Sequence, residues 1–160
     1  MRAGVLTVSD SGSRGVREDT GGPLVASLLG ELGFEVEVSA LVPDEQSDIE
    51  TVLRQWADDL DLDLVLTTGG TGLDPRDVTP EATLAVLHRV TPGITEAMRA
   101  NGLALTPFAA LARQVAGQRG GTLIINLPGS PKAIQECFTA LAPILPHAVK
   151  VGRRPAETSS

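Results

Sequence analysis

The run Thr67-Thr68-Gly69-Gly70-Thr71-Gly72 places glycines and hydroxyl side chains directly after a short apolar stretch, residues 62–66. Glycine leaves backbone N–H groups unobstructed, so such a loop can close around an anion, and the threonine hydroxyls add donors. Ligands of open α/β sheets bind at the carboxyl ends of strands. We therefore predict that this loop holds a phosphate group.

Two carboxylates follow predicted strands and belong to the same chemistry. Asp44 comes after the strand pattern that begins at Phe34, and Asp77 lies shortly beyond Gly72. Such acids repel phosphate unless they hold Mg²⁺, orient water or accept a proton from a hydroxyl group. Two interpretations stay open from spacing alone. In a magnesium-assisted nucleotidyl transfer both acids act on the substrate, whereas in a structural role Asp44 caps the next helix and Asp77 braces the loop.

Two common phosphate-loop signatures, the Walker A loop and the GxGxxG fingerprint, are absent from the sequence. No Lys-Ser or Lys-Thr pair follows Gly70-Thr71-Gly72, so the run is not a Walker A loop. No GxGxxG fingerprint occurs either. The predicted anion site is therefore of a different type.

Two more loops carry similar residues after predicted strands. Residues 3–9 predict a buried first strand that leads into the loop Asp10–Gly15, which is either an ordinary turn capped by Asp10 or a second wall of the site. The strand 122–126 leads into Leu127-Pro128-Gly129-Ser130-Pro131-Lys132, where Ser130 is a natural N-cap before Pro131. Parallel strands end at one edge of a sheet, which predicts a crevice among residues 9–15, 67–79 and 126–132.

Helical patterns alternate with these strands. Apolar side chains at helical spacing predict a helix from Leu24 to Leu32, stopped by Gly33, and a second one in which Ser47-Asp48-Ile49-Glu50 forms a capping box before Trp56. Thr79 as N-cap and Thr91-Pro92-Gly93 predict two further helix starts. The glycines of residues 115–126 predict a hairpin, and Pro143 bends or ends the helix after Ser130.

Strands that alternate with helices predict an α/β fold with a mostly parallel sheet covered on both faces. We expect a single domain over residues 1–152 and a loose polar tail over residues 153–160. Residues 1–6 pass straight into a strand pattern and lack the long apolar region and cleavage site of a signal peptide, so we expect none there. No apolar run is long enough to span a membrane.

Composition excludes several classes of function. The net charge of −7 argues against a nucleic-acid-binding protein. A single cysteine, Cys137, permits no internal disulfide and favours a cytoplasmic protein, and we expect Cys137 in the core rather than as a nucleophile. His88 and His147 have no ligand at metal-binding spacing. The acidic residues from Asp58 to Asp63 lack the glycine and glutamate of a calcium loop and predict a solvated turn.

Two long motifs carry a resemblance to a known family. Residues 67–72 together with Arg76-Asp77-Val78-Thr79-Pro80-Glu81-Ala82, and residues 126–132, closely resemble the molybdopterin-binding family of molybdenum-cofactor biosynthesis. This family includes bacterial molybdopterin adenylyltransferases, their B-type relatives and the gephyrin G domain. Val8-Ser9-Asp10 and Val42-Pro43-Asp44-Glu45 match in type and order. The resemblance spans residues from about 3 to 150.

The resemblance implies a three-layer α/β/α sandwich, the molybdopterin-binding domain fold, that assembles as a homotrimer or hexamer. It also implies a nucleotidyltransferase that converts molybdopterin and ATP into adenylylated molybdopterin and pyrophosphate with Mg²⁺. A molybdate insertase is then a possible partner. A non-catalytic B-type molybdopterin-binding or scaffold protein is the alternative, to which the short chain and Ala112, where many relatives carry serine, point. A molybdate-inserting domain ranks third.

Site residues follow from the resemblance by position. Asp44 and Asp77 match the two critical acids of the family, with Mg²⁺ positioning and activation of the molybdopterin phosphate as the implied role. The substrate-binding positions are Ser9, Asp10, Ser13, Thr68, Gly69, Gly70, Thr71, Gly72, Pro128, Gly129, Ser130, Pro131 and Lys132. The residue types themselves suggest Arg76 and Lys132 as cations that neutralise phosphate charge.

Overall fold

A computed structural model describes residues 1–155 of the chain and shows one six-stranded sheet with the strand order β2-β1-β3-β6-β5-β4. Strands β2, β1, β3 and β6 run parallel, while β5 pairs antiparallel with both β6 and β4. The predicted mostly parallel sheet is therefore confirmed, with the predicted hairpin as its antiparallel end. The strands are β1 (Arg2–Val8), β2 (Glu35–Val42), β3 (Leu64–Thr68), β4 (Arg89–Val90), β5 (Ala116–Arg119) and β6 (Thr122–Leu127).

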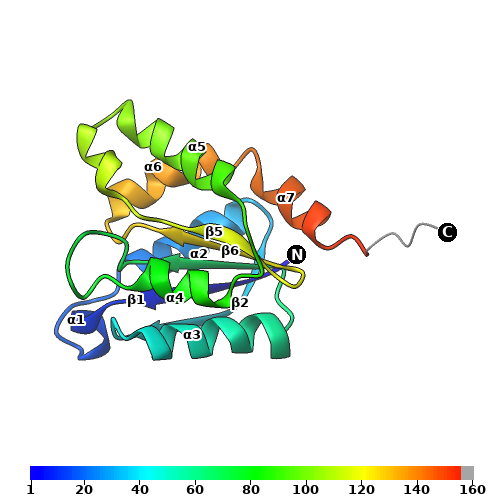
Figure 1. Cartoon of the computed structure of the whole chain (residues 1–160), viewed down its shortest axis with the longest axis horizontal. Helices are drawn as coiled ribbons and strands as arrows, with labels where there is room; N and C mark the ends of the chain where they lie inside the picture. Colours follow the sequence, from blue (N-terminus) through cyan, green and yellow to red (C-terminus); the bar gives the residue numbers. More distant parts are fainter. Residues whose placement is uncertain (156–160) are drawn as a thin grey trace.

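Helices cover both faces of this sheet, which gives the three layers (Figure 1). The helices are α1 (Asp10–Ser13), α2 (Gly21–Glu31), α3 (Gln46–Arg54), α4 (Thr79–Val86), α5 (Pro92–Leu103), α6 (Pro131–Leu141) and α7 (Leu145–Gly152). A π-helical turn, η1 (Gln55–Asp59), extends α3, and a 3₁₀ turn, η2 (Pro107–Leu111), follows α5. Helices α3 and α4 lie on one face, and α2, α5, α6 and α7 lie on the other.

Each face has its own apolar core. Leu29 of α2, Met98 of α5 and Phe138 of α6 pack with strand residues on one side. Ile49 of α3 and Val86 of α4 pack on the other side. The central strands β3 and β6 are buried along their whole length, whereas β2 alternates between exposed and half-buried residues as expected of an edge strand. Within residues 1–155, no helix is long and apolar enough to cross a membrane.

The topology places a ligand crevice between β1 and β3. From β1 the sheet grows to β2 on one side and to β3 and β6 on the other, so the winding direction reverses between β1 and β3. Ligands of doubly wound sheets bind at such a reversal, beyond the carboxyl ends of the strands. The loops that begin at Ser9, Gly69 and Pro128 all start at this edge.

Several predicted boundaries are wrong for local reasons. Residues 10–13 form a short helix rather than an irregular loop, because Ser9 Oγ accepts the N–H of Gly12 at 3.0 Å. The capping box before Trp56 is not used, because the Ile49 N–H already bonds to the Glu45 carbonyl at 3.2 Å and α3 begins at Gln46. Strand β3 starts at Leu64 and not at Leu62, where the apolar pattern predicts a strand over residues 62–67, since the Leu62 N–H bonds to the Trp56 carbonyl.

Two further expectations need correction. Thr79 is not the N-cap of α4, whose cap position is Val78; the Thr79 hydroxyl instead donates to the Gly69 carbonyl at 2.9 Å. Arg153, expected in a loose tail, is fixed by its guanidinium, which hydrogen-bonds to Asp61 and Asp63. Residues 156–160 of that predicted tail lie outside the described part of the chain.

Candidate active site

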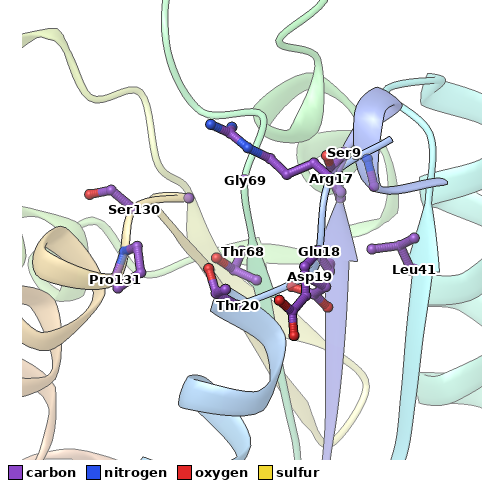
Figure 2. Close-up of a pocket in the computed structure, with 15 residues that line it drawn as sticks. Ser9, Arg17, Glu18, Asp19, Thr20, Leu41, Thr68, Gly69, Ser130 and Pro131 are labelled. Atoms are coloured by element: carbon purple, nitrogen blue, oxygen red, sulfur yellow. Dashed lines mark hydrogen bonds between the residues drawn. The ribbon is translucent and has the colours of Figure 1, made fainter. Parts of the chain in front are cut away.

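A cavity of about 520 Å³ opens at the carboxyl ends of β1, β3 and β6 (Figure 2). Of the residues predicted from sequence, Ser9, Thr68 and Gly69 line it from β1 and β3. Gly129, Ser130 and Pro131 line it from the loop after β6. The three loops that the sequence pattern selected therefore do meet at one place.

The loop Gly69–Gly72, called the anion loop below, depends on glycine at two positions. Gly69 and Gly70 have φ angles of +96° and +70°, which side-chain-bearing residues rarely adopt. A Cβ on Gly69 would lie 2.3 Å from the Val8 carbonyl oxygen, and one on Gly70 would lie 2.3 Å from Thr79 Oγ1. The loop can therefore pass this close to β1 and α4 only as glycine.

The loop after β6 begins helix α6 at the cavity. Ser130 Oγ accepts the Ala133 N–H at 3.2 Å, so the predicted N-cap is confirmed. The Pro128 carbonyl accepts a hydrogen bond of 2.8 Å from the hydroxyl of Thr68, which ties this loop to β3. The positive end of the α6 dipole thus faces the same cavity edge as the anion loop.

Asp44 lies beside the anion loop and is held by Asp10. The Asp10 N–H donates to Asp44 Oδ2 at 2.8 Å, and the Asp44 N–H donates to Asp10 Oδ1 at 2.9 Å. The other Asp44 oxygen lies next to Gly70, since a Cβ built there would be 3.0 Å from Oδ1. Burial raises the pKa of Asp44, and the charges of Asp10 and Asp77 add to that effect against the hydrogen bond from Asp10.

Asp77 approaches the same loop from its far end. Its Oδ2 accepts the Asp74 N–H at 3.1 Å, and a Cβ on Gly72 would lie 2.9 Å from that oxygen. Asp44 and Asp77 therefore lie beside the same loop, Asp44 next to Gly70 and Asp77 next to Gly72. Neither acid lines the cavity of Figure 2; they flank the anion loop beside it.

The two acids suit a Mg²⁺ that is shared with a substrate. Mg²⁺ is usually bound by one or two carboxylates together with substrate phosphates and water. Within the described chain, one carboxylate oxygen of Asp44 and one of Asp77 accept a backbone N–H, while the second oxygen of each accepts no hydrogen bond. In residues 1–155, no three His, Cys, Asp or Glu residues are grouped to hold a metal by themselves. This donor set therefore fits Mg²⁺ that arrives with a phosphorylated ligand.

Arg76 is engaged with protein carboxylates. Its guanidinium donates to both oxygens of Asp10 at 3.0 and 3.1 Å and to Glu45 at 2.9 Å. These hydrogen bonds, to Asp10 first, raise the pKa of Arg76 above its ordinary value and hold the pKa of the Asp10 carboxyl below its own. Arg76 thus joins the Asp77 loop to α1 and to the start of α3.

The remaining predicted binding residues divide into two groups. Thr71, Gly72 and Pro128 line a second cavity, of about 320 Å³, on the side of α5 and α6. Asp10, Ser13, Gly70 and Lys132 line neither of these two cavities. The Ser13 hydroxyl donates to the Asp10 carbonyl at 2.9 Å, and Lys132 is exposed on the first turn of α6.

A segment that was not among the predicted site residues closes the main cavity in front of α2. Arg17, Glu18, Asp19, Thr20 and Gly21 all line the cavity. Asp19 accepts the Thr7 hydroxyl and the Gly22 N–H, both at 2.9 Å, and so ties this segment to β1 and starts α2. Asp19 placed three residues before Gly22 is a helix-start signal that could have revealed it.

Within residues 1–155, Arg17 is the single arginine or lysine that lines this cavity. Figure 2 shows its side chain extending from the β1 side toward the side of Gly69 and Ser130. A guanidinium is a bidentate donor for phosphate oxygens. Arg17 is therefore the cation that the structure places at the cavity.

Comparison with known proteins gives one family and several close relatives. The model of a family described as "Probable molybdopterin binding domain" matches residues 4–147. A molybdopterin adenylyltransferase of Helicobacter pylori (strain J99) is 46% identical over 154 residues, which is 93% of this chain and 86% of the relative. The molybdenum cofactor synthesis protein cinnamon of Drosophila melanogaster is also 46% identical, over 91% of this chain. The chain spans only about a quarter (24%) of the cinnamon protein.

A solved structure agrees over nearly the whole chain. The molybdopterin biosynthesis enzyme MoaB from Thermus thermophilus is 54% identical and superposes with a TM-score of 0.91. The match covers 98% of this chain and 99% of that one. The predicted three-layer fold is thus confirmed by comparison as well as by the topology.

Proposed function

This chain belongs to the probable molybdopterin-binding domain family, and on that premise we propose that it is a nucleotidyltransferase that adenylylates molybdopterin. One observation carries the proposal. Two carboxylate oxygens that the described chain leaves free, on Asp44 and Asp77, flank a glycine loop at the meeting point of three strand ends. Acids beside an anion-binding loop favour phosphate chemistry over simple phosphate storage.

In the proposed reaction, an oxygen of the terminal phosphate of molybdopterin attacks the α-phosphorus of ATP. The new P–O bond forms as the bond between the α-phosphorus and the β-bridging oxygen breaks, and pyrophosphate leaves with that electron pair. Catalysis of this type is mainly positioning and electrostatic stabilisation. The anion loop and the start of α6 would hold the attacking phosphate, while Asp44 and Asp77 face the reacting groups.

Mg²⁺, when bound with the nucleotide, would neutralise charge on the phosphates and would be held by Asp44 and Asp77. Burial and the negative charges of Asp10 and Asp77 raise the pKa of Asp44, and a cation bound there would act in the opposite direction. Arg17 supplies a protein cation at the cavity, and exposed Lys132 lies near its edge on α6. Arg76, which is already paired, is better placed to hold Asp10 and Glu45 than to bind substrate.

A second candidate is a B-type protein that binds molybdopterin without adenylylating it. The short chain and Ala112, at a position where the family resemblance leads us to expect serine, motivate this alternative. It predicts saturable binding of molybdopterin with no consumption of ATP. Both candidates use the same cavity, so turnover is what separates them.

We further propose a cytoplasmic homotrimer or hexamer that passes its product to a molybdate insertase. Apolar side chains that are exposed on and beside α5 and η2 support self-association, namely Leu103, Leu105, Phe108 and Leu111. Light scattering tests the assembly state directly. A monomer at micromolar concentration contradicts it.

The test of function is an assay with purified chain, molybdopterin, ATP and Mg²⁺ that measures pyrophosphate and adenylylated molybdopterin together. We expect both products in equal amounts. Molybdopterin binding without either product favours the binding-only candidate, and the absence of binding contradicts both.

A further inference from the structure

Every carbonyl of the anion loop is turned toward one of two residues, Thr79 and Arg113. Thr79 donates to Gly69 O from its hydroxyl at 2.9 Å and to Gly70 O from its N–H at 3.2 Å. Arg113 donates to Thr71 O from its N–H at 3.0 Å and to Gly72 O from Nε at 2.8 Å. All four carbonyl oxygens of the loop are therefore occupied, two from the start of α4 and two from the segment between η2 and β5.

This arrangement fixes the direction of the loop's N–H groups. In a trans peptide the C=O and N–H point in opposite directions, and no peptide bond in the described chain is cis. The N–H groups of Gly70, Thr71, Gly72 and Leu73 therefore point away from Thr79 and Arg113. Among residues 1–155, none of these N–H groups donates a hydrogen bond to another residue.

Arg113 also reaches the peptide that follows Asp77. Its Nη2 donates to the Asp77 carbonyl oxygen at 2.8 Å, and Nη1 donates to both carboxylate oxygens of Glu81 at 3.1 and 2.8 Å. Glu81 lies in the first turn of α4 and thereby orients the guanidinium. One side chain thus connects Gly72 with Asp77, the two ends of the segment that carries the candidate acid.

We infer that Arg113 and Thr79 are positioning residues that present the N–H groups of the anion loop to a phosphate and set the place of Asp77. This inference rests on the proposed function for the identity of the phosphate. Its structural content, that each of the two residues orients particular N–H groups, does not depend on turnover. Arg113, distant in sequence from the glycine motif, would carry no substrate contact of its own.

The inference makes a residue-resolved prediction for anion binding. Arg113→Ala removes the hydrogen bonds to Gly72 O and Asp77 O but keeps the backbone bond to Thr71 O, so the Leu73 and Val78 N–H groups lose their orientation. Thr79→Val removes only the hydroxyl bond to Gly69 O, so the Gly70 N–H is the one affected. A general loss of stability would change all of these groups together.

The experiment is a titration of ¹⁵N-labelled protein with inorganic pyrophosphate, followed by amide chemical shifts. In the natural chain we expect saturable shifts at Gly70, Thr71, Gly72 and Leu73. We expect Arg113→Ala to lose the amide shift at Leu73 and to keep the one at Gly70. We expect Thr79→Val to lose the shift at Gly70 and to keep the one at Leu73. Arg89→Ala, which removes an exposed arginine of β4, serves as the control and should match the natural chain.

Chemical rescue and kinetics complete the test. Added guanidinium ion should restore the Leu73 shift in Arg113→Ala, because it can occupy the vacated place beside Glu81. If the natural chain turns over, Arg113→Ala should lower kcat by about 10²-fold, as expected of displaced catalytic groups, and Thr79→Ser should retain activity. Equal losses at all four amides in both variants, or an undisturbed loop in Arg113→Ala, overturn the inference. If the natural chain shows no turnover but Arg113→Ala still affects only Leu73 and Thr79→Val only Gly70, the proposed function is contradicted and the inference is not.

Discussion

Asp10 and Asp44 are joined by reciprocal hydrogen bonds, because each donates its backbone N–H to the other's carboxylate at 2.8 and 2.9 Å. The pair joins the loop after β1 to the loop after β2. Arg76 neutralises Asp10 from the third loop through a bidentate contact. The same geometry leaves Asp44 with raised pKa and one oxygen directed at the anion loop.

The raised pKa of Asp44 predicts the acid limb of the activity profile. Asp44 must be ionised to act, so kcat/KM should fall as the pH drops through a pKa above that of an ordinary aspartate. Asp10→Asn removes a negative charge that raises this pKa and keeps the N–H donor, so the limb should move to lower pH. Measurement of kcat/KM against pH in both proteins checks this, and a limb that moves upward contradicts it.

Loss of either acid should stop turnover while substrate binding remains. We expect Asp77→Asn and Asp44→Asn to reduce kcat by at least about 10²-fold, the range of a lost acid–base or charge-positioning group. Calorimetric titration with molybdopterin should still show binding, since the anion loop is intact. Asp59→Asn, an exposed acid of η1, is the matched control. Unchanged turnover in Asp77→Asn contradicts the assigned role.

A methyl group added to the anion loop should lower stability far more than one added to a turn that has open space around it. Gly70 and Gly120 have similar φ angles, +70° and +56°, but a Cβ on Gly70 meets Thr79 Oγ1 at 2.3 Å whereas one on Gly120 meets nothing within 4 Å. Gly120→Ala should cost about 1 kcal/mol of backbone strain. Gly70→Ala should lower the free energy of unfolding further and abolish anion binding. If urea denaturation shows equal losses of unfolding free energy in Gly70→Ala and Gly120→Ala, the loop geometry is contradicted.

The contact between Arg153 and Asp63 should stabilise the fold at neutral pH and lose this effect in acid. Burial raises the pKa of Asp63, but hydrogen bonds from the Arg2 N–H and from Arg153 outweigh it and leave that pKa below its ordinary value. The contribution is therefore present above the unfolded pKa and is lost as the pH falls through the folded one. Arg153→Met should lower Tm by about 2–4 °C near neutral pH, for a loss of ~1 kcal/mol.

Arg154→Met is the control for that measurement, because Arg154 is exposed and neighbours Arg153 in the chain. The difference in Tm between Arg153→Met and the natural chain should shrink in strong acid. A difference that grows on acidification contradicts the sign of the linkage.

Sequence alone predicted those parts of the fold and site that depend on local pattern. Buried strands appear in the sequence as apolar runs, and helix starts such as Ser130-Pro131 depend on residues next to one another. Both can therefore be predicted from the sequence. The convergence of three loops followed from parallel strands having a common end. The roles of Asp44 and Asp77 in the reaction stay predictions.

What the sequence could not show depends on contacts between distant residues. Thr79 looks like an N-cap until the Gly69 carbonyl, ten positions earlier, is found against its hydroxyl. Arg76 looks like a free cation until Asp10 is seen beside it, 66 positions away. Arg153 and Arg113 also bind partners far from any motif that marks them. Contacts between side chains that are far apart in the sequence leave no trace in the hydrophobic periodicity.

The most direct test of the account is single-turnover formation of adenylylated molybdopterin by the natural chain, with ATP, Mg²⁺ and molybdopterin that a known adenylyltransferase accepts in parallel. We expect one pyrophosphate per molybdopterin adenylylated and loss of both products in Asp77→Asn. Bound molybdopterin that is never adenylylated, under conditions in which the known enzyme completes the reaction, would contradict it.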